Sequence, residues 1–321
     1  MRVLNVTDID AGLLHETAVT IGNFDGVHRG HQELFRRLIS RGEANGLLPV
    51  VVTFEPHPLR VLAPSTAPAL ITTMEQKLEL LAAAGIPCAV IIRFTPEFAG
   101  VTAESFVSEW LCDSLGMRHI VIGHDYAFGR GRSGDCRTLE FLGAERAFTV
   151  EYMEPVGEKG IVFSSSAARR LVSSGDMEGA AEVLGRFHLV AGTVVHGAER
   201  GRDLGYPTAN IAVENELLPP DGVYAVKVLV GGELVSGACN IGRNPTFAAE
   251  HRTVEVFLLD FDRRIYGCKI AIWFVRRLRS EHKFAGSAEL IKAIENDVAQ
   301  ARLILNFVDH NRLQPMQRNG M

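Results

Sequence analysis

Two histidines, His28 and His31, stand three residues apart between a short apolar run and the start of a helical pattern. Three glycines flank them, at Gly22, Gly26 and Gly30. Glycine lets the backbone approach a ligand closely, and a helix N-terminus offers free N–H groups and the positive end of the helix dipole. Two imidazoles placed here can donate hydrogen bonds to charge that grows on a phosphoryl oxygen. The pattern therefore predicts a phosphate-binding turn with catalytic histidines.

Three other interpretations of this turn stay open. The histidines could cap the helix or face solvent, they could bind zinc, or the glycines could form a dinucleotide-binding fingerprint. Zinc sites on helices more often use an i, i+4 spacing, and no cysteine stands nearby in the sequence. The glycines are spaced by four and four, which differs from GxGxxG. The position of the turn at the end of a predicted strand favours the phosphate site.

The elements around the turn predict how it is positioned. Strands are expected at 18–21, 48–54, 89–94, 120–122 and 148–152, and helices at 28–45, 73–84, 103–115 and 138–146. Continuous apolar strands that alternate with helices indicate a parallel, doubly wound sheet with right-handed crossovers. Such sheets bind ligands at the carboxyl ends of their strands, where this turn lies.

The second half of the chain has a different period. A short helix is expected at 176–184, followed by strands at 189–195, 223–230, 233–239, 253–260 and 269–277 and a closing helix at 287–307. Consecutive short strands joined by Gly, Asn and Pro turns indicate an antiparallel barrel or sandwich. We therefore expect two domains, 1–185 and 186–321.

Composition limits the classes of protein that the chain can belong to. Its 321 residues correspond to roughly two domains. Residues 1–185 carry 16 Lys and Arg against 23 Asp and Glu, and residues 186–321 carry 17 against 15, which argues against nucleic-acid binding by bulk charge. The longest apolar stretches, such as Leu47 to Phe54, fall short of the ~18 residues that span a bilayer. Five scattered cysteines without a CxxC pair predict reduced thiols and a cytoplasmic protein.

The first half also resembles a known family. Residues 22–32 read GNFDGVHRGHQ, which resembles the HxGH signature of the nucleotidyltransferase superfamily in the form found in prokaryotic bifunctional riboflavin kinase/FAD synthetases. TFEPHP at 53–58, GHDYAFG at 123–129 and SSSAAR at 164–169 are similar to further elements of that family.

The resemblance implies roles for individual residues of the first half. It implies catalytic roles for His28, His31 and Arg169, the last as a clamp on the β and γ phosphates of ATP. It implies ATP binding by Gly22, Asn23, Phe24, Asp25, Gly26, Gly30, Ser164 and Ser165, and contacts on the flavin side by His57, Asp125 and Phe128.

Residues 197–210, GAERGRDLGYPTAN, resemble the riboflavin kinase signature. The resemblance implies that ATP phosphates bind at Gly197, Gly201, Arg202, Gly205 and Pro207, and that Thr208 and Asn210 hold Mg²⁺ through hard oxygen atoms. Turn formation is the alternative role of these residues. Glu255 lies within an apolar strand pattern, where a carboxylate is costly without a partner. It is our candidate for the general base, and a structural salt bridge is the alternative.

Together these features predict an enzyme that uses Mg²⁺ and ATP to phosphorylate riboflavin to FMN and then to adenylylate FMN to FAD. We expect riboflavin, FMN and ATP as its partners, with no nucleic acid or membrane, and the oligomeric state is left open. Two rival hypotheses remain. One is a nucleotidyltransferase for another phosphorylated substrate, with the barrel as a specificity module. The other is a flavin-binding regulator that has lost catalysis.

Overall fold

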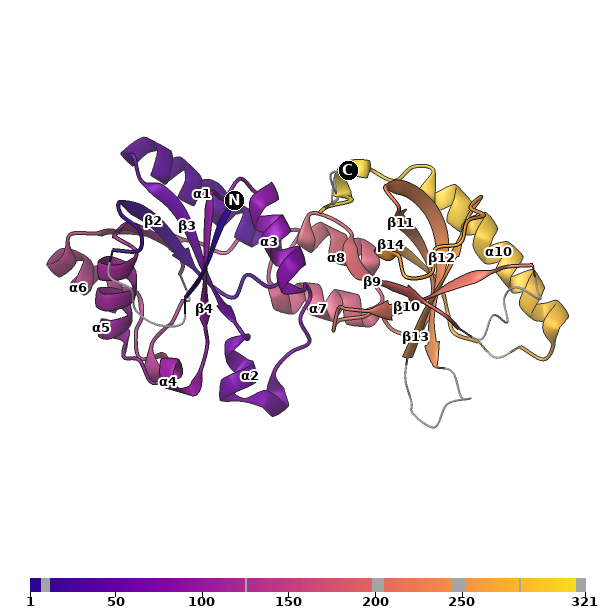
Figure 1. Cartoon of the computed structure of the whole chain (residues 1–321), viewed down its shortest axis with the longest axis horizontal. Coiled ribbons are helices and arrows are strands. Elements are labelled where there is room, and N and C mark those ends of the chain that lie inside the picture. The colour runs from indigo at the N-terminus through magenta and orange to yellow at the C-terminus, as the bar shows by residue number, and fades with distance from the viewer. Residues whose placement is uncertain (7–11, 125, 198–204, 244–251, 283, 316–321) are drawn as a thin grey trace. The chain divides into compact units, whose positions relative to one another are not determined.

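The computed structural model describes residues 1–6, 12–124, 126–197, 205–243, 252–282 and 284–315, which form two compact units. The first unit comprises residues 1–69 and 74–164, and the second comprises 70–73 and 165–321. Figure 1 shows a sheet with helices in the first unit and a barrel in the second. The expected domain boundary after residue 185 stays a prediction. By packing, the chain passes into the second unit at residue 165.

The first unit is built on a six-stranded parallel sheet. Its strands are β1 (Arg2–Val6), β2 (Thr17–Ile21), β3 (Leu48–Glu55), β4 (Cys88–Arg93), β5 (Met117–Gly123) and β6 (Thr149–Met153). They lie in the order β1-β4-β3-β2-β5-β6. The order reverses at β2, which pairs with β3 on one side and β5 on the other. Ligands of such sheets bind in the crevice at this reversal.

Helices cover both faces of this sheet. They are α1 (Arg29–Asn45), α2 (Pro58–Leu62), α3 (Met74–Ala83), α4 (Pro96–Ala99), α5 (Ala103–Ser105), the π-helix η2 (Phe106–Ser114) and α6 (Cys136–Arg146), with short 3₁₀ turns η1 (Pro64–Thr66) and η3 (Arg130–Arg132) and a small hairpin of β7 (Gly157–Glu158) and β8 (Ile161–Val162). One core cluster joins the sheet to α1 and α3, and a second joins it to α5, η2 and α6. The doubly wound architecture is thereby confirmed.

The second unit is a closed antiparallel barrel. Its strands are β9 (His188–Val195), β10 (Thr208–Val213), β11 (Gly222–Val230), β12 (Glu233–Arg243), β13 (Arg252–Leu258) and β14 (Lys269–Ser280), in the order β10-β13-β12-β11-β14-β9. Alternate residues point into the barrel, as the fully buried Val254 and Val256 do on either side of the half-buried Glu255. Alternation of this kind is expected where one face of a strand is covered and the other faces outward.

The second unit also contains helices outside the barrel strands. They are α7 (Ser165–Ser174), α8 (Met177–Leu184) and α10 (Ser287–Leu305), with a 3₁₀ turn η4 (His310–Arg312). Ala181 of α8 and Leu305 of α10 share a core cluster with Trp273 on the outer side of β14. The expected barrel with a closing helix is confirmed; α8 packs on β9 and β14, and α7 packs on α8.

A four-residue segment from the first half of the chain completes the second unit. The Leu70 N–H donates to Glu216 Oε2 at 3.0 Å, and the Leu217 N–H donates to the Leu70 carbonyl at 3.2 Å. The Asn215 amide donates to the carbonyl of Ile71 at 3.3 Å, and the Ile71 side chain is buried. Residues 70–73 are therefore held by the loop that precedes β11.

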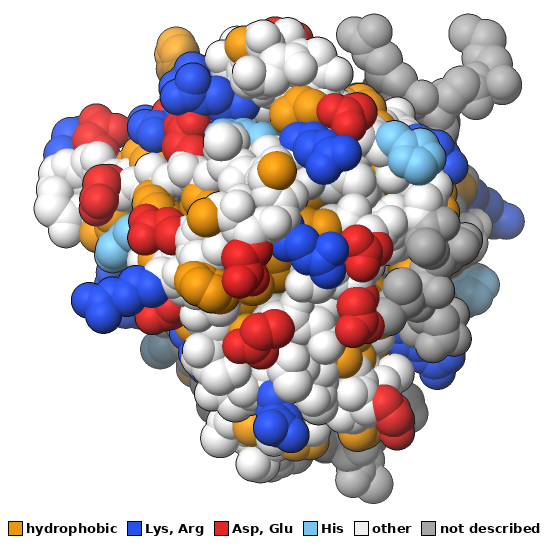
Figure 2. All heavy atoms as spheres, turned by 90° about the vertical axis from the view of Figure 1, so that its left-hand side faces the viewer, with side chains coloured by type: hydrophobic (Ala, Val, Ile, Leu, Met, Phe, Trp, Pro, Cys, Tyr) orange, Lys and Arg blue, Asp and Glu red, His pale blue; other side chains and the backbone are white. Residues whose placement is uncertain are grey.

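Figure 2 shows one face of the molecule, on which Lys and Arg side chains are interspersed with Asp and Glu. Such mixing does not create a field of one sign on that face. Among the residues that the structure describes, no helix is long and apolar enough to cross a membrane.

Candidate active sites

The turn that follows β2 is the first candidate site, and the neighbouring strand β3 holds it in place. The Gly22 N–H donates to the Val52 carbonyl at 3.1 Å. The Thr53 hydroxyl donates to the carbonyl of Asn23 at 3.3 Å. These contacts fix the turn at the carboxyl end of the sheet, beside the strand-order reversal.

The backbone of this turn is unusual. Phe24 and Val27 have positive φ angles of 46° and 40°, although neither is glycine, and Gly26 between them has a φ of 79°. The side chains of Phe24 and Val27 are buried, which anchors the turn in the core. Left-handed conformations at non-glycine residues are costly and concentrate at functional sites. Gly26 adopts a conformation that favours glycine, and its predicted role in a close approach of the backbone to a ligand stays a prediction.

His28 and His31 lie together at the start of α1, as the sequence predicts. Their rings stack with centroids 3.5 Å apart and an interplanar angle of 28°. His28 is the N-cap residue, and its Nδ1 accepts a hydrogen bond from the His31 N–H at 3.4 Å. The capping interpretation is therefore correct for one nitrogen of His28. Because Nδ1 is the acceptor, a neutral His28 carries its proton on Nε2, which can donate to a ligand.

Gly30 is needed for the close packing beneath the histidines. A Cβ added to Gly30 would lie 2.9 Å from the Phe163 carbonyl oxygen and 3.1 Å from the ring of His28. Next to it, Arg29 pairs with Glu158 at 2.9 Å and covers the ring of Phe163. Gly30 and Arg29 thus both pack the turn against Phe163.

Lys77 is a charged residue near this site that sequence reasoning missed. It lies on α3 with only 7% of its surface exposed, and burial lowers the pKa of its ammonium group. The negative charges of Asp25, in the turn, and Glu55, at the end of β3, oppose this shift. The sequence did contain a signal for its burial. Lys77 stands three residues before Leu80 and four before Leu81, which are both buried, and this spacing places it on the same face of the helix.

The predicted flavin-side residues have different environments. His57 is the N-cap of α2, where its Nδ1 accepts from the Leu59 N–H at 3.2 Å. Phe128 is buried in the core against Tyr126 and Phe106. The third predicted residue, Asp125, lies outside the described residues. Flavin contacts of all three stay predictions.

The predicted second signature lies at the change between the two units. Ser164 ends the first unit, and Ser165 and Arg169 belong to α7 in the second. The helix begins at Ser165, so Arg169 lies in its second turn and does not open it after a serine turn. The role of Arg169 as a phosphate clamp stays a prediction.

The second candidate site lies on the outer face of the barrel. The Thr208 hydroxyl donates to Glu255 Oε2 at 3.3 Å, from β10 to β13. In the strand register, Asn210 lies opposite Glu255, and Glu255 lies opposite Asn240 of β12. Residues paired in this way point to the same face of a sheet. Glu255 therefore faces outward among polar groups, and its described partner is a hydroxyl instead of the cation that the salt-bridge alternative requires.

The polar residues Thr208, Asn210, Glu255 and Asn240 form a row across β10, β13 and β12. At one side of this polar row, Gly197 and Asn210 approach each other closely. A Cβ added to Gly197 would lie 2.0 Å from the side-chain nitrogen of Asn210. Gly205 has a φ of 82°, and Tyr206 packs edge-on against Phe257 at 5.3 Å. Pro207 leads directly into β10. Gly201 and Arg202, the other predicted phosphate ligands, lie outside the described residues.

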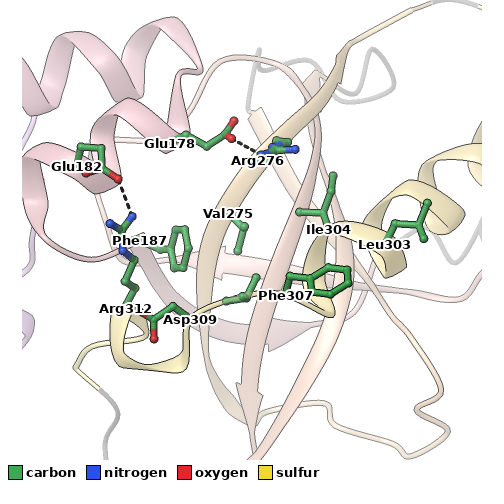
Figure 3. Close-up of a pocket in the computed structure, with 11 residues that line it drawn as sticks. Glu178, Glu182, Phe187, Val275, Arg276, Leu303, Ile304, Phe307, Asp309 and Arg312 are labelled. Carbon is green, nitrogen blue, oxygen red and sulfur yellow. Dashed lines mark hydrogen bonds and ion pairs between the residues drawn. The ribbon is translucent and has the colours of Figure 1, made fainter.

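A hollow of about 550 Å³ in the second unit lies away from the predicted site residues. Figure 3 shows its apolar floor, with Phe187 and Val275, and its rim, where Glu182 pairs with Arg312 at 2.9 Å and Glu178 pairs with Arg276. Asp309, which also lines the hollow, accepts a hydrogen bond from the Asn311 N–H at 2.9 Å.

Comparison with known proteins shows which family the chain belongs to. The family model described as FAD synthetase matches residues 11–167, and the one described as riboflavin kinase matches residues 184–305. The bifunctional riboflavin kinase/FMN adenylyltransferase of Escherichia coli K12 is 39% identical over 285 residues, which cover 88% of this chain and 91% of the relative. The chain belongs to the bifunctional riboflavin kinase/FMN adenylyltransferase family. The Bacillus subtilis member is 37% identical and covers 94% of this chain and 97% of its own length.

A solved structure extends the likeness to the fold. The crystal structure of a protein from Streptococcus pneumoniae described as a macrolide-efflux protein has a TM-score of 0.85 and 28% identity to this chain, and covers 94% of this chain and 99% of its own. The family assignment explains why two sites of different architecture lie on one chain. The turn after β2 falls in the FAD synthetase half, and the row Thr208, Asn210 and Glu255 falls in the riboflavin kinase half.

Proposed function

We propose that this chain converts riboflavin to FMN on the outer face of the barrel and FMN to FAD at the turn after β2. Two family models on one chain and relatives of the same name over most of its length support the two activities. The observation that carries the kinase assignment is the Thr208–Glu255 contact within the row of polar residues across β10, β13 and β12. The stacked pair His28 and His31 carries the adenylyltransferase assignment.

In the kinase reaction, Glu255 accepts the proton of the riboflavin 5′-hydroxyl as its oxygen attacks the γ-phosphorus of ATP, and ADP leaves. A general base has to lie within hydrogen-bond reach of the group that it deprotonates. The outward, half-buried position of Glu255 meets this requirement better than a position inside the barrel would. The Thr208 hydroxyl holds the carboxylate in orientation at 3.3 Å.

Thr208 and Asn210 are suited to hold Mg²⁺ with the ATP phosphates. A hydroxyl and an amide carbonyl two residues apart on β10 are hard oxygen donors, the donor type that Mg²⁺ prefers. Bound there, the cation would neutralise charge on the transferred phosphoryl group. The near absence of space between Gly197 and the Asn210 amide limits the positions that this side chain can take.

In the adenylyltransferase reaction, a phosphate oxygen of FMN attacks the α-phosphorus of a second ATP, and pyrophosphate leaves. No covalent nucleophile of the protein is needed, so positioning and charge stabilisation dominate. His28 Nε2–H and the His31 ring lie side by side at the N-terminus of α1, where donors and the helix dipole both favour negative charge.

The five cysteines are thiols, which supports a reducing, cytoplasmic setting.

One incubation tests the proposal against its rivals. Purified protein is mixed with riboflavin, ATP and Mg²⁺, and the flavins are separated over time. We expect FMN first and FAD later. If riboflavin is left unchanged while another phosphorylated substrate consumes ATP and releases pyrophosphate, the barrel is a specificity module. If flavin binds tightly without turnover, the chain is a binding protein.

A further inference from the structure

Glu281 lies directly over the backbone of Gly242, at one end of the polar row on the barrel. Its Oε1 would be 2.6 Å from a Cβ added to Gly242, and the side-chain nitrogen of Asn240 would be 3.5 Å from the same point. The carboxylate and the amide therefore lie over the same backbone carbon. A residue larger than glycine at 242 would displace the Glu281 side chain from this position.

The end of β14 is anchored in a way that fixes Glu281. Arg279 donates to both oxygens of Asp297 on α10, with Nε 3.0 Å from each and Nη2 2.8 Å from Oδ2. Only 5% of the Asp297 side chain is exposed, so this pair is much less screened than a surface ion pair. Arg279 also covers the ring of Phe284. The residues on both sides of Glu281 in the sequence are thus held by packing and charge.

Glu281 extends the polar row that contains Glu255. Asn240 lies opposite Glu255 in the register of β12 and β13 and next to Glu281 over Gly242. The outer face consequently presents a carboxylate, an amide and a second carboxylate in succession. Carboxylates accept hydrogen bonds only, and an amide both donates and accepts. Such a succession matches a chain of hydroxyl groups, each of which donates one hydrogen bond and accepts others.

We propose that Glu281 binds hydroxyls of the ribityl chain of riboflavin and so contributes to the affinity of the barrel for its substrate. This inference rests on the kinase site proposed above. Glu255 takes the proton of the reacting hydroxyl, and Glu281 accepts hydrogen bonds from hydroxyls farther along the chain. Asn240 lies between the two carboxylates and provides a donor. Glu281 is an exposed carboxylate in the free protein, so it is hydrated and available until the polyol displaces its water.

The test measures flavin binding and turnover in the full chain. Glu281→Ala and Glu281→Gln are compared with the parent, and Glu295→Gln on the exposed side of α10 serves as the matched control. Riboflavin and lumiflavin, in which a methyl group replaces the ribityl chain, are titrated by flavin fluorescence. We expect Glu281→Ala to weaken riboflavin binding about 10- to 100-fold, the range for a lost hydrogen bond to a charged group. Lumiflavin binding should not change.

Kinetics then distinguish this role from others. The KM for riboflavin should rise by the same factor while kcat and the Mg²⁺ dependence stay near those of the parent, with Glu281→Gln between the parent and Glu281→Ala. Equal losses for riboflavin and lumiflavin would overturn the proposal, since they indicate general damage to the barrel. A shift in the Mg²⁺ requirement alone would make Glu281 a cation ligand and would also overturn it.

Failure of this inference can be told apart from failure of the kinase site. If Glu281→Ala binds riboflavin normally while Glu255→Gln loses turnover, only the role of Glu281 is wrong. If Glu255→Gln and Thr208→Ala both phosphorylate riboflavin at the parent rate, the site itself is misplaced, and the ribityl assignment is lost with it.

Discussion

The side-chain amide of Asn210 occupies the space in which any residue other than glycine at position 197 would carry its Cβ, 2.0 Å from the amide nitrogen. Glycine at this position therefore leaves room for a side chain of the neighbouring strand β10. This steric role is separate from any binding of phosphate by its backbone. A change at Gly197 acts on the proposed cation ligand without altering that ligand chemically.

Gly197→Ala should displace the Asn210 amide and reduce riboflavin phosphorylation more than tenfold at low Mg²⁺, with partial recovery as Mg²⁺ is raised. A displaced oxygen ligand costs affinity for the cation before it costs the chemical step. Initial rates over a Mg²⁺ series measure this effect. Gly286→Ala is the control, because a Cβ there meets nothing within 4 Å. Loss of rate that no Mg²⁺ concentration restores would contradict the explanation.

His31→Ala should suppress FAD formation about 10²- to 10³-fold while riboflavin still becomes FMN. The imidazole is one of two stacked donors at the start of α1, and the kinase site is built from other elements. Separation of FMN and FAD from a single incubation measures both activities in the same sample. Loss of both activities in a folded variant would mean that the sites are not independent.

Glu255→Gln should slow phosphorylation of riboflavin by about 10²- to 10⁴-fold with riboflavin affinity largely kept. Glutamine retains the shape of the side chain and can accept from the Thr208 hydroxyl, but it cannot take the proton of the substrate. Adenylylation of supplied FMN provides the control for folding of the chain. A variant with weaker binding and a lower melting temperature would instead indicate a structural role for the carboxylate.

A fragment that begins at residue 165 should retain kinase activity and melt at a higher temperature than one that begins at residue 186, although both lack residues 70–73 and should therefore melt below the full chain. The shorter fragment lacks α8, whose Ala181 packs in one core cluster with Phe187 and Trp273. Exposure of one large apolar side chain costs about 1.5–3 kcal/mol, which corresponds to roughly 5–10 °C in a domain of this size. Calorimetry of the two fragments measures the difference. Equal melting temperatures would show that α7 and α8 add little to the barrel.

Acidification below about pH 6.5 should destabilise the parent more than a His119→Gln variant. Burial lowers the pKa of His119, and the nearby Glu151 only partly opposes this. Below about pH 6.5 the imidazole of His119 therefore binds a proton in the unfolded state but not in the folded state. The free energy of unfolding consequently falls until the pH reaches the pKa of the folded state. Urea unfolding from pH 8 to 5 measures the slope, and His310→Gln, at an exposed position, is the control. The same slope in both variants and the parent would refute this assignment.

The parallel sheet, the barrel and both candidate sites could be predicted because their signals are local. Continuous apolar strands, a glycine-rich turn and a paired histidine motif each occupy a few neighbouring residues. The strand β1 gave no such signal, because Arg2–Val6 is a short edge strand with mostly exposed side chains. The turn signature also concealed β10, since Thr208–Val213 carries polar residues on its outer face.

Features that depend on distant partners could not be predicted. Glu255 appeared to lie within an apolar strand, and only the closure of the barrel shows that it faces outward beside Thr208. Lys77 became notable only when the fold brought it near Asp25 and Glu55. The helix expected at 103–115 is interrupted by a change to π-helical winding at Phe106, which a 3.6-residue pattern cannot reveal.

Residues 70–73 are hydrogen-bonded to the loop at 215–217, so the second unit is not a continuous stretch of chain. A barrel grafted from a relative by a single crossover would meet a foreign segment at the place where Ile71 is buried and Asn215 bonds to its carbonyl. Chimeras of this family should therefore exchange two stretches of sequence together. A recombination library with only one breakpoint would be depleted of stable members for this reason alone.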